Sequence, residues 1–302
     1  MIPLFPEFKK LEISDKEDVN FFTSNFKPTS DFNFAGTWSW DVTDGMQISQ
    51  LNSNYVIRFI DYSSREPFFT FLGVNNTTDT VMKILDFAKS EGIKEELKLI
   101  PDFCIENFDK NLFKIEEDRD NFDYIYSLQE LKELKGGKFK AKRNENNTFL
   151  RKNPSACVSV LNLDDENTIK EIREIFYFWN KEKNKKNQDF DLSEELIVIE
   201  RLISAHKKLN LKTLGVFVDK RLVSFVIFEL LNFGYAIGHV AKSYPEFSGA
   251  NIFLLNQCAF FFDNEGVLLL NLEQDLGEDS LRVSKMRLGP IDFIKKFRIS
   301  RV

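Results

Sequence analysis

The alternation of apolar and polar residues predicts a regular order of strands and helices in the first half of the chain. Residues 55–61 and 67–73 are mostly apolar runs of strand length. A helix is predicted next, because apolar residues recur at the spacing i, i+3, i+4, i+7 and Gly92 provides a stop. Residues 97–102 predict a buried strand. The apolar face of the helix consists of Val81, Ile84, Leu85 and Ala88.

The second half repeats this order of elements. Residues 168–171 have the sequence of a capping box at a helix start, and an apolar helical face follows them. A helix near residues 193–208 comes next, then two strand-like runs within 214–230 that meet at a hairpin turn, Asp219-Lys220. A strand at 235–242, a helix at 249–262 and a buried strand at 267–272 complete the series.

The first half also begins with a predicted helix, because Ser14-Asp15-Lys16-Glu17 has the sequence of a capping box. Both halves therefore run helix, paired strands, helix, buried strand. This order is that of the Gcn5-related N-acetyltransferase (GNAT) fold. The pattern predicts an α+β protein with two tandem acetyltransferase-like domains, each a mixed, mostly antiparallel sheet flanked by helices.

Composition narrows the class of protein. Of 302 residues, 29% are charged and 43% hydrophobic, and 32 phenylalanines predict an aromatic core. A formal charge of −6 argues against general nucleic-acid binding, although a local basic patch can still bind phosphates. Three scattered cysteines indicate reduced thiols, and the two histidines have no metal-ligand spacing, so we expect no metal site. We see neither a secretory signal nor an apolar run of membrane length, and expect a cytoplasmic protein.

Three passages resemble one known family. They are "DFNFAGTWSW" at residues 31–40, "DYIYSLQELKELKGGKFKAKRNENNTFL" at 123–150 and "LNLEQDLGEDSLRVSKMRLGP" at 270–290. All three are similar to signatures of the phosphatidylglycerol lysyltransferase C-terminal domain family. The resemblance implies a tandem acetyltransferase-like fold related to enzymes that move an aminoacyl group from transfer RNA onto an amine or hydroxyl of a lipid or peptidoglycan. The chain departs from the full lysyltransferase because it shows no membrane-embedded segment, so we expect a soluble member of the family without the membrane domain, and the departure argues against a lipid acceptor.

Pattern and resemblance together predict three parts of the chain. Residues 1–122 form an N-terminal acetyltransferase-like domain without a donor site. Residues 123–160 form a basic segment between domains. Residues 161–302 form a C-terminal acetyltransferase-like domain that holds the donor and acceptor sites.

The donor site is predicted at two places. In acetyltransferase-like folds the donor phosphates lie at the N-terminus of the helix after the fourth strand, where free backbone N–H groups and the helix dipole favour anions. The alternative there is a serine-capped helix start with a small residue for packing. The basic run is the second place, and its alternative is a solvated helix or linker. The predicted donor-binding residues are Ser248, Gly249, Ala250 and Asn251 at the helix start, and Lys140, Lys142, Arg143 and Asn144 in the basic run.

Catalytic and acceptor-binding residues are predicted around the last two strands. His239 is a candidate general base, Tyr244 a candidate proton donor to the leaving group, and Glu273 a second candidate base. The alternative for His239 is a hydrogen-bonded core residue. Polar side chains at the end of a buried strand indicate a site for a cationic acceptor. Alternatively, the cations there pair with the carboxylates as a structural lock. The predicted acceptor-binding residues are Gln274, Asp275, Arg282 and Lys285.

These residues predict an acyl or aminoacyl transferase. The donor would be a coenzyme A thioester or aminoacyl-tRNA, used as a co-substrate without a tightly bound cofactor, and the acceptor an amine or hydroxyl. Partners would include the transfer-RNA acceptor end. The alternative is a non-catalytic ligand-binding or regulatory protein on a degenerate tandem acetyltransferase fold, because the glycine-rich loop of the fold is reduced to the single Gly249.

Overall fold

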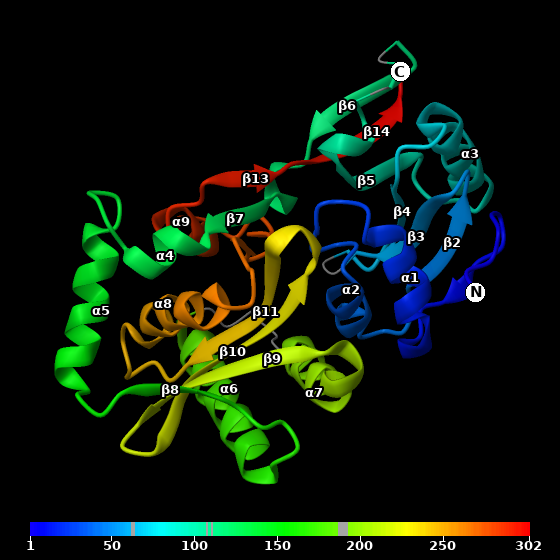
Figure 1. Cartoon of the computed structure of the whole chain (residues 1–302). Coiled ribbons are helices and arrows are strands. Elements are labelled where there is room, and N and C mark those ends of the chain that lie inside the picture. Colours follow the sequence, from blue (N-terminus) through cyan, green and yellow to red (C-terminus); the bar gives the residue numbers. More distant parts are fainter. Residues whose placement is uncertain (62–63, 107, 110, 187–192) are drawn as a thin grey trace. The chain divides into compact units, whose positions relative to one another are not determined.

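The computed structural model describes residues 1–61, 64–106, 108–109, 111–186 and 193–302. Its internal contacts divide the chain into two compact units (Figure 1). The first unit contains Met1–Asp123, Gln274–Arg282 and Phe293–Val302, and the second contains Tyr124–Glu273 and Val283–Asp292. The chain therefore returns to the first unit after completing most of the second.

The first unit is built on a mixed sheet with strand order β1-β2-β3-β4-β5-β14-β6. Neighbouring strands are antiparallel except β4 and β5, whose parallel pairing is recorded at Phe69 and Leu97. The strands are β1 (Lys9–Lys10), β2 (Gln47–Leu51), β3 (Asn54–Ile60), β4 (Pro67–Leu72), β5 (Glu96–Pro101), β6 (Phe113–Glu117) and β14 (Lys296–Arg301). The helices are α1 (Lys16–Thr23), α2 (Phe34–Trp40) and α3 (Thr77–Ser90).

The second unit is built on a sheet with strand order β13-β7-β12-β11-β10-β9-β8. Helices α6 and α8 pack on β10 and β11. The strands are β7 (Asp123–Ser127), β8 (Cys157–Val160), β9 (Leu211–Val218), β10 (Arg221–Leu231), β11 (Tyr235–Ser243), β12 (Leu269–Asn271) and β13 (Asp292–Ile294). The helices are α4 (Leu128–Glu133), α5 (Lys140–Lys152), α6 (Glu166–Lys186), α7 (Ser193–Leu209), α8 (Ala250–Asp263) and α9 (Asp279–Arg287).

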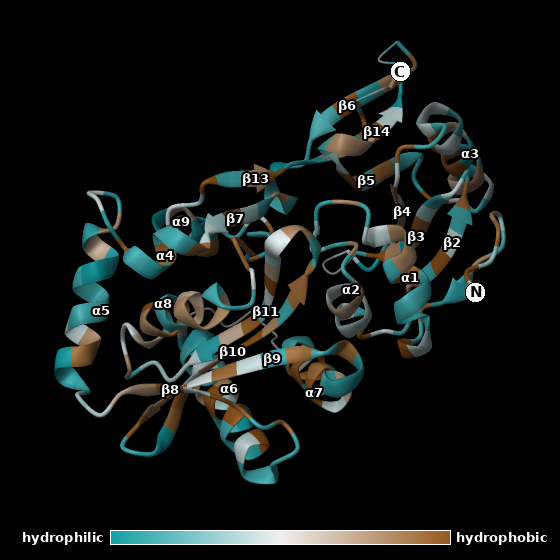
Figure 2. Ribbon diagram, in the orientation of Figure 1, coloured by the Kyte–Doolittle hydropathy of each residue, from teal (hydrophilic) through white to brown (hydrophobic). Residues whose placement is uncertain are grey.

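Aromatic side chains fill both cores, as the phenylalanine content predicts. Burying an aromatic side chain removes a large apolar area from water, so these residues contribute strongly to stability. Figure 2 shows the contrast between the largely apolar α8, which is buried along most of its length, and the largely hydrophilic α5. The largest fully buried side chains include Phe32, Phe34, Tyr55, Phe69 and Phe71 in the first unit, and Tyr124, Tyr126, Phe139, Phe149, Phe225, Phe228 and Phe262 in the second.

Two strands of the second unit separate part-way along their length. β12 is parallel to β11 and pairs with it only from Tyr235↔Leu269 to Ile237↔Asn271. β11 continues to Ser243, and β10 pairs with it over that whole length. Along the rest of β11, the edge that faced β12 therefore has no partner among the described strand pairings. Backbone N–H and C=O groups at such an edge remain able to bond to a ligand.

The predicted α+β fold with two tandem acetyltransferase-like sheets is confirmed. The start of α6 differs from the prediction. The helix begins at Glu166, before the predicted capping box at residues 168–171. The Asp165 carboxylate caps it by accepting hydrogen bonds from the backbone N–H and hydroxyl of Thr168. The predicted hairpin is present, with Asp219 and Lys220 both at positive φ, which a two-residue turn of this kind requires.

The contact-based units and the predicted domain ranges share a division near residue 122. They differ in three places. Residues 274–282, which fall within the predicted C-terminal domain, lie in the first unit. Residues 124–160 lie in the second unit, because β7 pairs with β12, and both α4 and α5 pack on α8. The C-terminal strand β14 lies in the first unit because it pairs with β5 and β6.

Candidate active site

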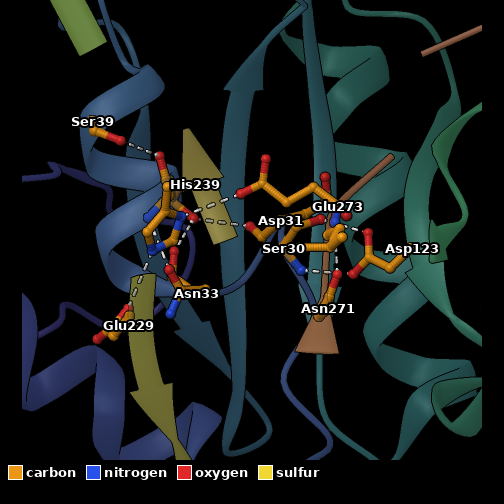
Figure 3. A network of polar contacts seen from close by, with 12 residues as sticks. Ser30, Asp31, Asn33, Ser39, Asp123, Glu229, His239, Asn271 and Glu273 are labelled. Carbon is orange, nitrogen blue, oxygen red and sulfur yellow. Dashed lines mark hydrogen bonds and ion pairs between the residues drawn. The ribbon is translucent and has the colours of Figure 1, made fainter. Parts of the chain in front are cut away.

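An acid–histidine–acid chain lies in the second unit where β11 and β12 separate (Figure 3). His239 belongs to β11, Glu229 to the neighbouring β10, and Glu273 follows the end of β12. The His239 Nδ1 atom is 3.2 Å from Glu273 Oε1, and its Nε2 atom is 3.6 Å from Glu229 Oε2. The imidazole ring therefore has a carboxylate at each nitrogen.

A β-bulge places His239 in this position. Ile227 pairs with Val240 and Phe228 with Gly238, so His239 is an extra residue with no opposite partner in β10. Bulges of this type redirect one side chain and are common beside active sites. Gly238 is needed next to the bulge, because a Cβ atom there would lie 2.8 Å from the Phe228 ring and 2.9 Å from the Leu272 side chain.

His239 is positively charged at neutral pH. Burial by itself would lower its pKa, but the two carboxylates of Glu229 and Glu273 outweigh burial and raise the pKa to about 9. A histidine that already carries both protons cannot accept another, so the general-base role predicted for His239 does not suit this geometry. The protonated ring instead donates from Nδ1 to Glu273 and fixes the position of that carboxylate.

Glu273 is the most accessible group of the three. Its side chain is 18% exposed, compared with 8% for Glu229 and 0% for His239. The Glu273 backbone has a positive φ of 58° and is held there on both sides. Its N–H donates to the side-chain oxygen of buried Asn271, and its carbonyl accepts from the Tyr124 N–H. Glu273 is therefore a partly exposed carboxylate on a fixed backbone.

Asp275 and Arg282 form an ion pair in the first unit. Arg282 donates from Nε and an Nη atom to the two Asp275 oxygens, at 2.9 and 2.7 Å, and Arg119 lies 3.2 Å from the same carboxylate. Asp275 is fully buried, and it also accepts a hydrogen bond from the Gly277 N–H. These contacts are those of the structural-lock alternative, and the acceptor-binding role of Asp275 and Arg282 stays a prediction without geometric support.

Gln274 and Lys285, the other predicted acceptor-binding residues, also have partners. Gln274 donates to Asp31 within the first unit at 2.6 Å. Lys285 donates to the Leu272 carbonyl within the second unit at 2.6 Å, and its ammonium lies over the Tyr124 ring. Of the residues predicted at this strand end, Glu273 is the one whose position suits contact with a substrate.

A buried lysine cluster in the first unit was not predicted. Lys296 is fully buried and forms ion pairs with Asp123, at 2.7 Å, and with Asp31 (Figure 3 shows the two acids and Ser30). Ser30 donates to Asp123 from both its hydroxyl and its backbone N–H. Burial alone would lower the Lys296 pKa, but the two carboxylates outweigh it and raise that pKa. Because the buried Lys296 ammonium has oppositely charged partners, the cluster holds β14 in the first unit.

The predicted donor loop has one face against α5. Gly249 has a φ of +92°, and a Cβ atom there would lie 3.0 Å from the Glu145 carbonyl oxygen and 3.0 Å from Phe149 Cβ. These short distances explain why residue 249 is a glycine, because a side chain there would collide with α5. This is the packing alternative given for the helix start. Ser248 and Asn251 are exposed, Ala250 is buried, and the Asn251 side chain accepts a hydrogen bond from Ser224. Donor binding by these residues stays a prediction.

Tyr244, the predicted proton donor, lies under a cation. It is buried, with the Arg221 guanidinium 4.1 Å from its ring centroid and the Phe178 ring at 5.5 Å.

In the first unit, the loop after β4 is the counterpart of the predicted donor loop, and the Asn54 side chain bonds to it. Asn54 is fully buried, donates to the Asn75 carbonyl and accepts from the Asn75 N–H. The absence of a donor site from the first unit stays a prediction.

The predicted basic residues of α5 differ in their exposure and in their partners. Lys142 is 15% exposed and pairs with Glu145 at 3.2 Å. Arg143 donates to the carbonyls of Leu134 and Gly136 and so holds the turn before the helix. Lys140 and Asn144 are exposed.

Sequence reasoning missed Glu229, Asn271, Asp31, Asp123 and Lys296. Glu229 carries a usable signal, because it is a single acid within an apolar strand of eleven residues. Asp31 and Asp123 each begin a passage that carries the family resemblance. Lys296 gives no local signal, because its partners lie far away along the sequence.

Two observations bear on metals and membranes. Within the part of the chain that the structure describes, no three or more His, Cys, Asp or Glu side chains are arranged to hold a metal ion. Among the same residues, no helix has the length and apolar character needed to cross a membrane.

Fold and site define the class of this protein as an α+β protein of the tandem acetyltransferase-like type, with a charged histidine where two parallel strands separate. The family model described as "Phosphatidylglycerol lysyltransferase, C-terminal" matches residues 25–300. The chain belongs to this family. No curated protein shows significant sequence similarity to it.

Solved structures with the same fold include members of this family. A conserved protein of unknown function from Bacteroides thetaiotaomicron VPI-5482 is 23% identical, with a TM-score of 0.86, and each chain is covered to 100%. L-PGS from Bacillus licheniformis is 11% identical, with a TM-score of 0.64, covering 97% of this chain and 93% of that one. FemX is 11% identical, with a TM-score of 0.57, covering 97% and 96%.

Proposed function

We propose that the chain transfers an aminoacyl or acyl group from an activated ester or thioester to an amine or hydroxyl. The observation that carries this proposal is the row of three charged side chains, Glu229, His239 and Glu273. A β-bulge places His239 where β11 and β12 separate. Family membership supports aminoacyl transfer as the broad class of reaction. The donor would be a coenzyme A thioester or an aminoacyl-tRNA.

The free edge of β11 is the proposed position of the donor carbonyl. Beyond Ile237 this edge has no partner among the described strand pairings, so its backbone groups can bond to an extended donor. A backbone N–H aimed at the carbonyl oxygen would stabilise the negative charge that develops there during attack. Binding donor and acceptor side by side supplies the remaining rate enhancement through orientation.

Glu273 is the proposed general base. The acceptor nitrogen or oxygen attacks the carbonyl carbon and passes its proton to the Glu273 carboxylate. The bond between that carbon and the donor oxygen or sulfur then breaks, and the departing ribose hydroxyl or thiol takes up a proton, with Tyr244 as the proposed source. His239 and Glu229 act as positioning residues, because His239 donates a hydrogen bond to Glu273 and Glu229 lies at the other ring nitrogen of His239.

A non-catalytic ligand-binding protein is the second candidate function. The reduced donor loop favours it, since Gly249 packs against α5 and the helix start has no other glycine. On this alternative the fold would retain a ligand at β11 without transferring it.

The test is donor discharge by the parent protein. Labelled aminoacyl-tRNA and labelled acyl-coenzyme A are each incubated with the protein and a panel of amine and hydroxyl acceptors, including a polyamine and phosphatidylglycerol vesicles. We expect one donor to be consumed, with the label recovered on an acceptor. Saturable donor binding without discharge over the whole panel would contradict catalysis and support the binding alternative.

A further inference from the structure

Strand β8 lies at one edge of the second sheet (Figure 1). It pairs with β9 on one side, from Cys157↔Phe217 to Val160↔Leu214, and no strand among the described pairings covers its other side. The edge of a sheet presents unpaired N–H and C=O groups, which are a template for pairing with a further strand. β8 is therefore a candidate surface for contact with another chain.

This edge lacks the features that usually prevent such pairing. Residues 153–163, with the sequence "NPSACVSVLNL", contain no charged side chain, although 29% of the whole chain is charged. The proline of this stretch, Pro154, precedes β8, and the pairing of β8 with β9 has no register shift. Edge strands are usually protected by charges, prolines or bulges, so the composition of β8 favours a strand partner.

Two residues of β8 present their backbone groups to the open side. The Leu161 N–H donates to the Thr213 carbonyl of β9. Because backbone groups alternate in direction along an antiparallel strand, those of every second residue before Leu161 also point toward β9. The backbone groups of Val158 and Val160 therefore point away from β9.

Turns limit the open edge at both ends. Before β8, the Ala156 N–H donates to the Asn153 carbonyl. After β8, the Asn162 carbonyl accepts a hydrogen bond from the Asp165 N–H. The available edge is therefore short, and it is centred on Ser159.

We propose that β8 pairs with β8 of a second copy of this chain, antiparallel and about a two-fold axis at Ser159. In this register Val158 of each copy lies opposite Val160 of the other, and the two residues exchange both N–H···O=C hydrogen bonds. The two-fold axis makes this pair occur twice, once on each side of Ser159. The sheets of the two second units then form one continuous sheet.

The valine side chains support this register. Val160 is 57% exposed, and Val158 is half-buried. β-branched side chains that lie directly opposite each other on one face of a sheet contact and stabilise the pair. Pairing of two β8 strands therefore covers the exposed valines of both copies.

The charges on either side of β8 favour an antiparallel partner of the same sequence. Arg151 and Lys152 precede the strand, and the acidic residues 164–166 follow it. Arg151, Lys152 and Glu166 are exposed, and none of the three takes part in an ion pair among the described residues. Antiparallel pairing brings the cations before one β8 toward the acids after the other, whereas parallel pairing would bring like charges together.

The first experiment measures the mass of the whole chain in solution by sedimentation velocity over a concentration series. The test variant is Val160→Lys, which places a charge on the open edge. The matched control is Val283→Lys, because Val283 is a valine of α9 with a comparable exposed fraction of 47%. Circular dichroism melts confirm that each variant is folded.

We expect the parent to approach twice the chain mass of 35.3 kDa as the concentration rises. Val160→Lys should dimerise at least about tenfold more weakly, because the dimer contains the substituted position twice and each substitution removes a Val–Val contact. Val283→Lys should dimerise as the parent does. A parent that stays a monomer throughout the series, or equal weakening in both variants, would overturn the proposal.

Cysteine cross-linking tests the register independently of the affinity. In a background carrying Cys157→Ser, Ser159→Cys places two thiols opposite each other at the axis. The Cα atoms of such a non-hydrogen-bonded pair lie about 4.5 Å apart, within the range of a disulfide. Val160→Cys in the same background is the matched control, because its two thiols are offset along the strands and lie too far apart to form a disulfide.

We expect oxidised glutathione to convert the Ser159→Cys protein into a covalent dimer and to leave the Val160→Cys protein monomeric on a non-reducing gel. Cross-linking of the Val160→Cys protein in place of the Ser159→Cys protein would overturn the proposed register. Failure of both proteins to cross-link at concentrations where the parent is a dimer would show that the copies meet through another surface.

Discussion

At the residue scale, His239 shows most clearly how neighbouring groups determine the charge of a side chain. Burial opposes its charge, yet carboxylates at both ring nitrogens keep it protonated. The sequence showed a histidine on a strand before the donor loop, and general base was a reasonable role for it. The two acids could not be predicted as its partners, because one lies on the preceding strand and the other after a later one.

The stability of the fold should depend on pH through His239. A folded-state pKa of about 9, raised from 6.5, means that the contribution is fully present below pH 6.5 and is lost as the pH rises through 9. The shift corresponds to on the order of 3 kcal/mol. We expect urea unfolding to report a fall in the free energy of unfolding between pH 6.5 and 9.5 that is much smaller in His239→Gln. The same pH dependence in both proteins would contradict the charged histidine.

At the element scale, the Asp275–Arg282 pair fixes the loop after β12 to the first turns of α9. The sequence offered an acceptor site and an ion-pair lock as alternatives, and the spacing of the residues could not separate them. Burial favours the lock, because the Asp275 carboxylate is fully buried and has two arginine partners.

Neutralising this carboxylate should therefore destabilise the protein. Asp275→Asn leaves Arg282 and Arg119 without their buried partner, and we expect a loss of about 2 kcal/mol or more, below the full cost of breaking a buried pair because both arginines are partly exposed. Asp120→Asn is the matched control: Asp120 binds the same Arg282 but is 59% exposed, so its loss should cost under about 1 kcal/mol. Equal denaturant midpoints for the two variants would show that the lock does not stabilise α9.

Element type was predictable from periodicity along much of the chain, because apolar positions repeat with the period of the structure they bury. The strands around the Asp219-Lys220 turn and the helix after β4 illustrate this. What the pattern could not predict was partnership between distant segments. Lys296 anchors β14 through Asp31 and Asp123, and the return of the C-terminal strand to the first sheet has no local signature.

At the scale of the whole molecule, each of the two units is built on one mixed sheet. The units differ in which groups remain able to contact a ligand. The first unit fills its loop after β4 with Asn54 and buries its charges around Lys296. The second leaves a partly exposed Glu273 and an open strand edge. We therefore propose that the chemistry takes place in the second unit, where Glu273 would contact the acceptor, and that the first unit has a structural role.

The most direct test is the single-turnover rate constant for discharge of the donor that the parent uses, measured for the parent, Glu273→Gln and Glu265→Gln. Glu265 is an exposed acid of the same unit, just after α8, and it controls for loss of one negative charge. We predict that Glu273→Gln lowers the rate constant by about 10²-fold or more, the usual contribution of a general base, while leaving donor affinity within about twofold. Glu265→Gln should match the parent. A Glu273→Gln protein that discharges the donor at the parent rate would contradict the account.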